Sequence, residues 1–144
     1  MRLQGKVAIV TGAGGGIGAA ICRRFAAEGA ALIGVDLDAA ALASMAASVR
    51  AASGHVETLA ADVAEEASAE AAVACAQREF GDLDVLVSNA VRDLPLAPVT
   101  RLTLADWRRT MAVNLDAAFL FCKHAIPAME ARGGGSIILF ASGC

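Results

Sequence analysis

The sequence has 144 residues, of which 57% are hydrophobic and 19% are charged. This length suits one domain with a sizeable core, and this composition excludes an intrinsically disordered chain. The net charge of -3 comes without a basic block, which argues against nucleic acid or a membrane surface as the partner and favours a small molecule.

The apolar runs are too short for export or membrane insertion. The first run begins at Val7 and ends a few residues later at Gly12, so it is not the core of a signal peptide. Every later run is interrupted before the roughly 18 residues that a membrane-spanning helix needs. Four cysteines without C-x-x-C pairing predict reduced thiols in a cytoplasmic protein. His55 and His124 have no metal-ligand spacing around them, so no metal site is expected.

Short apolar runs alternate with long alanine-rich segments along the whole chain. Because each apolar run is continuous, we predict strands that are buried on both faces. The predicted strands are Val7–Thr11, Ala31–Val35, Val56–Ala60, Val85–Val87 and Ser136–Phe140. The predicted helices are Ile17–Glu28, Ala39–Ala52, Glu65–Phe80 and Leu104–Ala131. This alternation predicts an α/β fold with a doubly wound parallel sheet, in one domain over residues 1–144.

One long loop, Ala90 to Leu102, interrupts the alternation and contains Pro95 and Pro98. It follows the carboxyl end of a predicted strand, which is the edge where α/β proteins bind their ligands. Thr103 and Asp106 then have the spacing of a capping box and start the next helix. We therefore expect this loop to border the binding site.

The stretch TGAGGGIG, residues 11–18, joins the first predicted strand to the first helix. Gly12 permits a sharp turn, and Gly18 permits close packing of the helix on the sheet. Three glycines lie between them: Gly14, Gly15 and Gly16. They let the backbone approach a pyrophosphate, which the free N–H groups of the helix N-terminus bind. A flexible turn is the alternative, but the position between strand and helix favours a dinucleotide site.

Two acidic residues follow later predicted strands. Asp36 ends the second strand about 20 residues after the glycine-rich turn, where a dinucleotide site needs a carboxylate for the adenosine ribose. Its charge repels a 2′-phosphate, so NAD is favoured over NADP. The alternative is that Asp36 caps the next helix, although Asp38 is closer to that helix. Asp62 is compatible with both a cofactor contact and a helix cap, because Asp62 and Glu65 also have capping spacing.

Taken in order, these motifs resemble the short-chain dehydrogenase/reductase family over the whole chain. The resemblance rests on the glycine pattern, on Asp62-Val63, on LVSNA at Leu86–Ala90, on MAVNL around Asn114, and on GSIILFAS ending at Ser142. It implies a Rossmann-type sheet and an oxidoreductase that moves hydride between a nicotinamide cofactor and an alcohol or ketone.

The resemblance also implies which residues hold the cofactor. Ile17 belongs to the glycine motif and would contact the cofactor there. Asp62 and Val63 would hold the adenine end, and Asn89 and Ala90 would line the cofactor cleft.

Two further residues receive chemical roles by resemblance. Asn114 would support a water-linked proton relay, and Ser142 would hydrogen-bond the substrate oxygen. From the residues alone, Asn114 is a poor helix former inside a predicted helix, so a local kink is the alternative. A serine in a turn, such as Ser142, is ordinary.

The chain departs from the family pattern in two places. Val91 stands where the family commonly has glycine, and its branched side chain is expected to crowd the cleft. The family's acid/base is a tyrosine with a lysine four residues later, whereas this chain has no tyrosine and its lysines, Lys6 and Lys123, match neither position.

We therefore expect the N-terminal part of an enzyme, with the catalytic helix lying beyond the last residue. Three interpretations stay open: half of an active dehydrogenase, a nucleotide-binding fragment without turnover, or a chain completed by a partner. If the fifth strand forms a sheet edge, the chain is also expected to self-associate or form a homo-oligomer.

Overall fold

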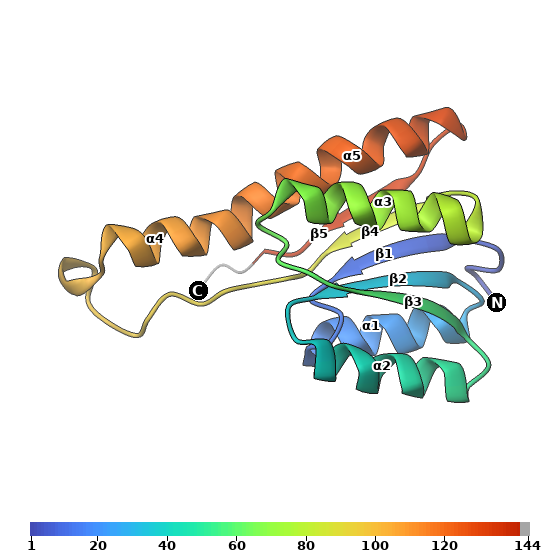
Figure 1. The fold of residues 1–144 in the computed structure, drawn as a ribbon, viewed down its shortest axis with the longest axis horizontal. Helices are drawn as coiled ribbons and strands as arrows, with labels where there is room; N and C mark the ends of the chain where they lie inside the picture. The colour runs from blue at the N-terminus through green and yellow to red at the C-terminus, as the bar shows by residue number, and fades with distance from the viewer. Residues whose placement is uncertain (142–144) are drawn as a thin grey trace.

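A computed structural model describes residues 1–141 of the chain (Figure 1). Within this range, one sheet of five parallel strands has the order β3-β2-β1-β4-β5. The strands are β1 (Val7–Thr11), β2 (Ala31–Asp36), β3 (His55–Ala60), β4 (Val85–Ser88) and β5 (Ser136–Leu139). Because β1 lies between β2 and β4, the strand order reverses there, and the sheet is doubly wound as predicted.

Helices cover both faces of this sheet (Figure 1). One face carries α1 (Gly16–Ala27) and α2 (Ala39–Ala51), and the other carries α3 (Glu66–Phe80) and α5 (Ala117–Ala131). No helix within residues 1–141 combines the length and apolarity that a membrane crossing requires.

The core has two halves, because alternate residues of each strand point to opposite faces of the sheet. Ile9 of β1 belongs to the cluster under α3 and α5, where Phe121 is fully buried. Its neighbour Val10 belongs to the cluster under α1 and α2, together with Leu42. Each fully buried side chain of this kind stabilises the fold by about 1.5–3 kcal/mol.

The predicted strands are confirmed to within one residue at each end, but their predicted burial is wrong for β3 and β5. In β3, His55, Glu57 and Thr58 are exposed, and all four residues of β5 are exposed. These two strands form the edges of the sheet, so each has a strand neighbour on one side only. The short runs rich in apolar residues therefore located the strands without showing which of them are central, although the run of β3 already contained Glu57 and Thr58.

The long helix predicted at Leu104–Ala131 is divided into α4 (Leu104–Met111), a π-helical turn (Ala112–Asp116) and α5. Figure 1 shows α4 and α5 as one rod, with the α4 end projecting beyond the sheet. The capping box is confirmed: the Thr103 hydroxyl accepts the Asp106 N–H at 3.1 Å, and the Asp106 carboxylate accepts the Thr103 N–H at 3.3 Å. The other predicted helices are confirmed to within one residue.

Candidate functional site

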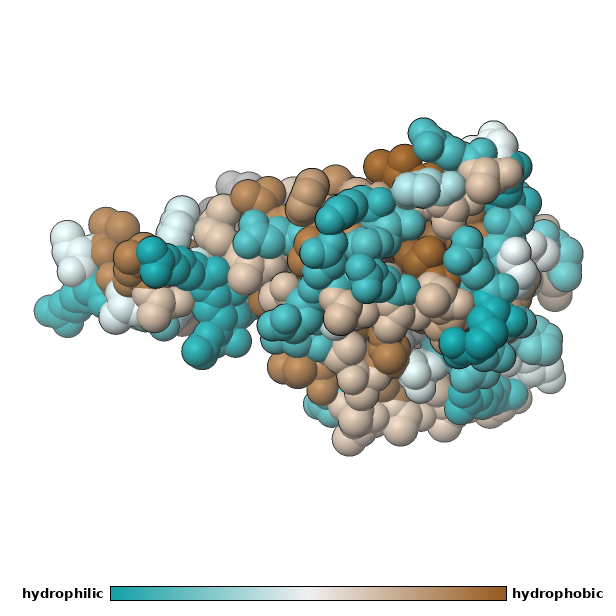
Figure 2. Space-filling view, turned by 45° about the horizontal axis from the view of Figure 1, so that its top comes forward, coloured by the Kyte–Doolittle hydropathy of each residue, from teal (hydrophilic) through white to brown (hydrophobic). Residues whose placement is uncertain are grey.

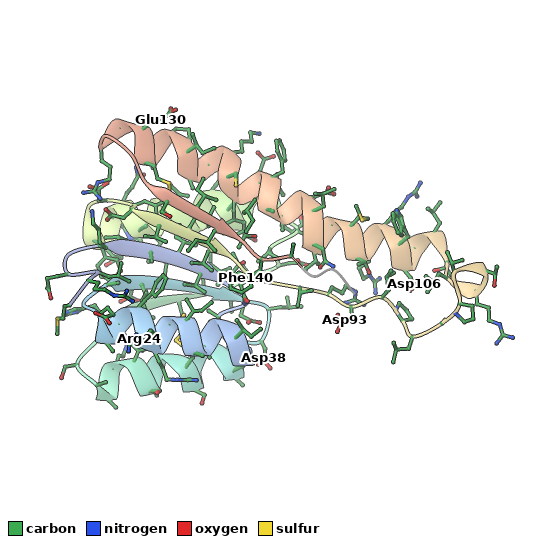
Figure 3. The ribbon with its side chains drawn as sticks, turned by 180° about the vertical axis from the view of Figure 1, so that it is seen from behind. Arg24, Asp38, Asp93, Asp106, Glu130 and Phe140 are labelled. Carbon is green, nitrogen blue, oxygen red and sulfur yellow. The ribbon has the colours of Figure 1, made fainter. Side chains whose placement is uncertain are left out.

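A cavity of about 510 Å³ opens at the carboxyl ends of β1, β2 and β4. Figure 3 shows Asp38, which follows β2, and Phe140, which follows β5, toward this end of the sheet. The predicted cofactor residues that line the cavity are Gly12, Gly15, Gly16, Ile17, Gly18, Asp36, Asp62, Val63, Asn89 and Ala90. The fold thus brings ten residues from four separate segments around one space, where the strand order reverses.

The glycine-rich turn packs too closely for side chains at Gly12 and Gly18. Gly12 has a φ of +66°, and a Cβ there would lie 2.9 Å from the Cα of Ala90. A Cβ on Gly18 would lie 2.0 Å from the Gly12 carbonyl oxygen. At Gly16, in contrast, a Cβ would meet no atom of the described residues 1–141 within 4 Å. Since Gly16 lines the cavity, the missing side chain there keeps ligand space open.

The positive end of α1 begins at this turn, and no side chain of the part of the chain that the structure describes caps it. Gly15 is the N-cap residue, and the first turn contains no acidic side chain. The first N–H groups of a helix have no partner within the helix, and the helix dipole adds partial positive charge there. The backbone of Gly16 and Ile17 therefore offers a binding site for an anion at the cavity wall.

Two backbone N–H groups hold the Asp36 carboxylate in place, one of them from the glycine-rich turn. Its Oδ2 accepts the Gly14 N–H at 2.9 Å, and its Oδ1 accepts the Asp38 N–H at 3.0 Å. Gly14 does not line the cavity, because it faces Asp36 and α2, where a Cβ would lie 2.7 Å from the Ala41 Cβ. The Asp38 carboxylate caps α2 by accepting the Ala41 N–H at 3.0 Å, so the capping role does not fall to Asp36.

Asp62 and Val63 form the cavity wall beyond β3. The Asp62 carboxylate accepts the Ala64 N–H at 2.9 Å within the turn that leads to α3. The N-cap residue of α3 is Glu65, so the alternative that Asp62 caps this helix is wrong. Asp62 is exposed, whereas Val63 is buried against the core.

A hydrogen-bonded network between β1 and β4 makes the base of the cavity. The buried Thr11 hydroxyl accepts the N–H groups of Asn89 and Ala90 at 2.9 and 3.0 Å. The Asn89 side-chain amide donates to the carbonyl oxygens of Thr11 and Gly12 at 3.1 and 3.4 Å. Sequence reasoning assigned no role to Thr11, although a hydroxyl at the end of an otherwise apolar strand is a detectable signal.

The loop after β4 borders the cavity only at its beginning. Val91 and Arg92 line the cavity, whereas the 3₁₀ turn Val99–Arg101 does not. Asn114, in the π-helical turn, holds the loop: its Oδ1 accepts the Arg92 N–H at 2.8 Å, and its Nδ2 donates to the Arg92 carbonyl at 3.0 Å. The helix is irregular at Asn114, where it forms a π-helical turn, and two of the hydrogen-bonding positions of the Asn114 amide hold the Arg92 backbone.

Ser142 lies outside the described residues. The strand that leads to it is tied to β4, since the Phe140 N–H donates to the Ser88 carbonyl at 3.0 Å. The chain therefore reaches the cavity edge of the sheet shortly before Ser142.

His124 has acidic neighbours that its sequence context did not reveal. Its Nε2 lies 3.0 Å from Glu66 Oε1 and 3.8 Å from Glu70 Oε1, and these three side chains could together hold a metal ion. However, Lys123 Nζ lies 2.6 Å from the same Glu66 oxygen. The hydrogen bonds from Lys123 and then from His124 lower the pKa of Glu66, so this carboxylate is already paired, and we assign no metal to it.

Comparison with known proteins identifies similar dehydrogenases. The D-threitol dehydrogenase of Mycolicibacterium smegmatis is 44% identical over 141 residues, which cover 98% of this chain and 54% of the relative. The cis-4-hydroxycyclohexanecarboxylate dehydrogenase of Sinomonas cyclohexanicum is 41% identical over 137 residues, which cover 95% and 55%. The chain thus spans about half the length of the curated relatives it matches.

A solved structure and a family model complete the comparison. A metagenomic short-chain oxidoreductase in complex with NADP superposes with a TM-score of 0.92 at 35% identity, over 99% of this chain and 64% of the other. The model of the short chain dehydrogenase family matches residues 6–144. The chain therefore belongs to the short-chain dehydrogenase/reductase family.

Proposed function

We propose that the cavity binds NAD and that the whole protein is an oxidoreductase, which transfers hydride between the nicotinamide and an alcohol or carbonyl carbon. The observation that carries this proposal is the glycine-rich turn, where the uncapped start of α1 meets a space that Gly16 keeps open. The bound cofactor supplies the hydride chemistry, and the chain's residues bind and orient it.

The cavity offers a partner for each part of the cofactor. The backbone N–H groups at Gly16 and Ile17 would bind the pyrophosphate. Asp36 would accept hydrogen bonds from the adenosine ribose, because among residues 1–141 each of its oxygens accepts one N–H group and retains a free lone pair. Asp62 and Val63 would hold the adenine end.

The nicotinamide half of the cofactor would extend past β1 toward β4. Asn89 and Ala90 would line this part of the cleft, held in place by the buried Thr11 hydroxyl. Ser142 would donate a hydrogen bond to the substrate oxygen. Asn114 would support the proton relay from the position that its two bonds to Arg92 fix.

The preference for NAD over NADP follows from the charge of Asp36. A 2′-phosphate beside this carboxylate would meet charge repulsion, so we expect NAD to bind at least about tenfold more tightly than NADP. Titration of the chain with both cofactors measures the ratio of dissociation constants. Asp36→Asn is expected to reduce this ratio, while Asp38→Asn, which removes the same charge outside the cavity, should leave it unchanged. Equal or tighter binding of NADP by the unaltered chain would contradict the assignment.

A second candidate function is nucleotide binding without turnover, which the absence of tyrosine from the 144 residues favours. Hydride transfer must be matched by proton transfer at oxygen, and a positioned acid or base typically contributes about 10²–10⁴-fold to the rate. We therefore expect the 144-residue chain to show no reduction of NAD with a panel of secondary alcohols, followed by absorbance. Turnover that depends on Ser142 and survives repurification would show that the chain is active by itself.

The names of the two relatives describe dehydrogenases of a polyol and of a hydroxy acid, and both support an alcohol or its ketone as the substrate here. These two names do not indicate whether the substrate of this protein carries a charge.

We also propose a cytoplasmic location and a self-associating chain. The first rests on the free thiols of Cys22, Cys75 and Cys122, which persist in reducing compartments, and the second on the exposed side chains of β5.

A further inference from the structure

We propose that Arg92 selects substrates with a carboxylate, so that the substrate class is a small hydroxycarboxylic acid or its oxo counterpart. This inference rests on the proposed function, because it needs a cofactor bound in the cavity. It concerns the substrate end of that site.

The charges along the cavity wall are separated. Among the described residues that line it, the acidic ones are Asp36 and Asp62, which follow β2 and β3. Arg92 is the one basic residue of this lining, and it follows β4, on the other side of β1. With the adenosine at Asp36, the pyrophosphate lies over the start of α1, and the reacting end of the cofactor extends toward Asn89 and Arg92. A cation at that end faces the substrate.

The backbone of Arg92 is held in place at the cavity rim. Asn114 binds both its N–H group, at 2.8 Å, and its carbonyl oxygen, at 3.0 Å. The rest of the loop has no such anchor from this side chain. The exposed Arg92 side chain therefore starts from a fixed backbone position beside the cavity.

The Arg92 guanidinium forms no ion pair within 4.0 Å among the described residues, although, after the hydrogen bonds from Thr103, its charge contributes to lowering the pKa of the Asp106 carboxylate on α4. Within residues 1–141, the ion pairs closer than 4.0 Å involve other arginines and lysines. The neighbouring Asp93 does not line the cavity. A guanidinium binds a carboxylate through two parallel N–H···O bonds, a geometry that an uncharged alcohol or ester cannot match.

The test measures how a second ligand changes the affinity of the full 144-residue chain for NADH, followed by NADH fluorescence. The second ligands are hydroxycarboxylates with short-chain and cyclohexane skeletons, each paired with its uncharged methyl ester. We expect at least one carboxylate to lower the dissociation constant of NADH about tenfold, while its ester has little effect. By reciprocity, NADH then tightens binding of the same carboxylate by the same factor.

Variants identify the cation responsible. Arg92→Gln should abolish the difference between carboxylate and ester, and Arg92→Lys should retain part of it because the charge remains. Arg101→Gln is the matched control, since it makes the same charge change on the same loop away from the cavity and should keep the full difference. Circular dichroism of each variant establishes that it is folded.

The outcomes separate the two proposals. If NADH does not bind, the proposed function itself fails. If NADH binds but every carboxylate acts like its ester, or if Arg101→Gln acts like Arg92→Gln, the role of Arg92 is wrong and the cofactor site stands. If Arg92→Gln weakens NADH alone, with no effect that depends on the carboxylate, Arg92 binds a cofactor phosphate and the substrate inference is overturned.

Discussion

The two edge strands of the sheet have the same parallel pairing but expose different side chains. β3 exposes the polar residues His55, Glu57 and Thr58, and its only exposed apolar residue is the small Ala60. β5 and the residue after it expose apolar side chains, with 41% of Ile138, 55% of Leu139 and 49% of Phe140 accessible. Polar and charged side chains are a usual protection of an edge strand, and β5 has none at its centre. The chemistry of β3 therefore suits a permanent edge, whereas that of β5 suits a covered strand.

The helices beside these strands continue the contrast. In Figure 2, apolar side chains lie among hydrophilic ones on the projecting end of the molecule, which contains α4. Leu104 and Trp107 of α4 are 60% and 51% exposed, and Phe119 of α5 is 63% exposed. We call β5, α4 and α5 the β5 flank, and β3 with α2 the β3 flank. Exposed apolar surface of this kind marks interaction sites or a tendency to aggregate.

The largest expected effect of this contrast is on the state of association. We expect the 144-residue chain to self-associate at tens of micromolar, because β5 offers unpaired backbone groups beside apolar side chains. Ile138→Lys should shift the chain toward monomer in size-exclusion chromatography, while Thr58→Lys on β3 should not. A sharp monomer peak of the unaltered chain, without binding of a dye for apolar surface, would remove the distinction between the two edges.

The next effect tests whether the two flanks fold as one unit. Phe121→Ala, in α5 of the β5 flank, should lower the free energy of unfolding by about 3–5 kcal/mol, because it leaves a cavity at a fully buried position. Leu42→Ala, in α2 of the β3 flank, should lower the free energy of unfolding by about 2–5 kcal/mol. Urea unfolding followed by circular dichroism should show one transition for both variants. Two separate transitions for Phe121→Ala alone would show that the β5 flank unfolds independently.

The smallest effect concerns the Cys22 thiol of α1, on the same sheet face as α2. Burial raises the pKa of Cys22 from 9.0 to about 12, whereas the unfolded thiol titrates near its ordinary value. Above pH 9 the unfolded state therefore binds fewer protons than the folded state, and stability falls as pH rises. We expect about 1 kcal/mol of stability to be lost per pH unit between pH 9 and 10. Cys22→Ala should reduce this dependence of the free energy of unfolding on pH, measured by urea unfolding at several pH values. An unchanged dependence would show that other groups cause it.

Much of the fold could be predicted because continuous apolar runs and alanine-rich segments mark buried strands and crossover helices directly. The edge positions of β3 and β5 could not be predicted, since strand order is set by contacts between distant segments. The polar Glu57 and Thr58 distinguish β3 from the apolar β5, yet only the topology shows that each of these strands has one neighbour.

The candidate site shows the same limit. Spacing alone identified Asp36, but the position of α2 was needed to show that Gly14 faces Asp36 and Ala41. Asn114 was recognised as an unusual helix residue, while its partner Arg92 lies 22 residues away on a loop without periodicity. Polar pairs of this kind leave no repeat in the sequence and are found only when the elements are placed in space.

The π-helical turn between α4 and α5 has a consequence for the chain lengths that the fold accepts. Each residue of a helix turns the chain by about 100°, so deleting one residue from Ala112–Asp116 would rotate α5 relative to α4. Either Phe121 would leave the core, or Asn114 would lose its hydrogen bonds to the Arg92 backbone. A change of length in the loop segment 93–98 would not rotate one helix relative to another in this way. Insertions and deletions should therefore accumulate in that loop during evolution and be absent from the turn.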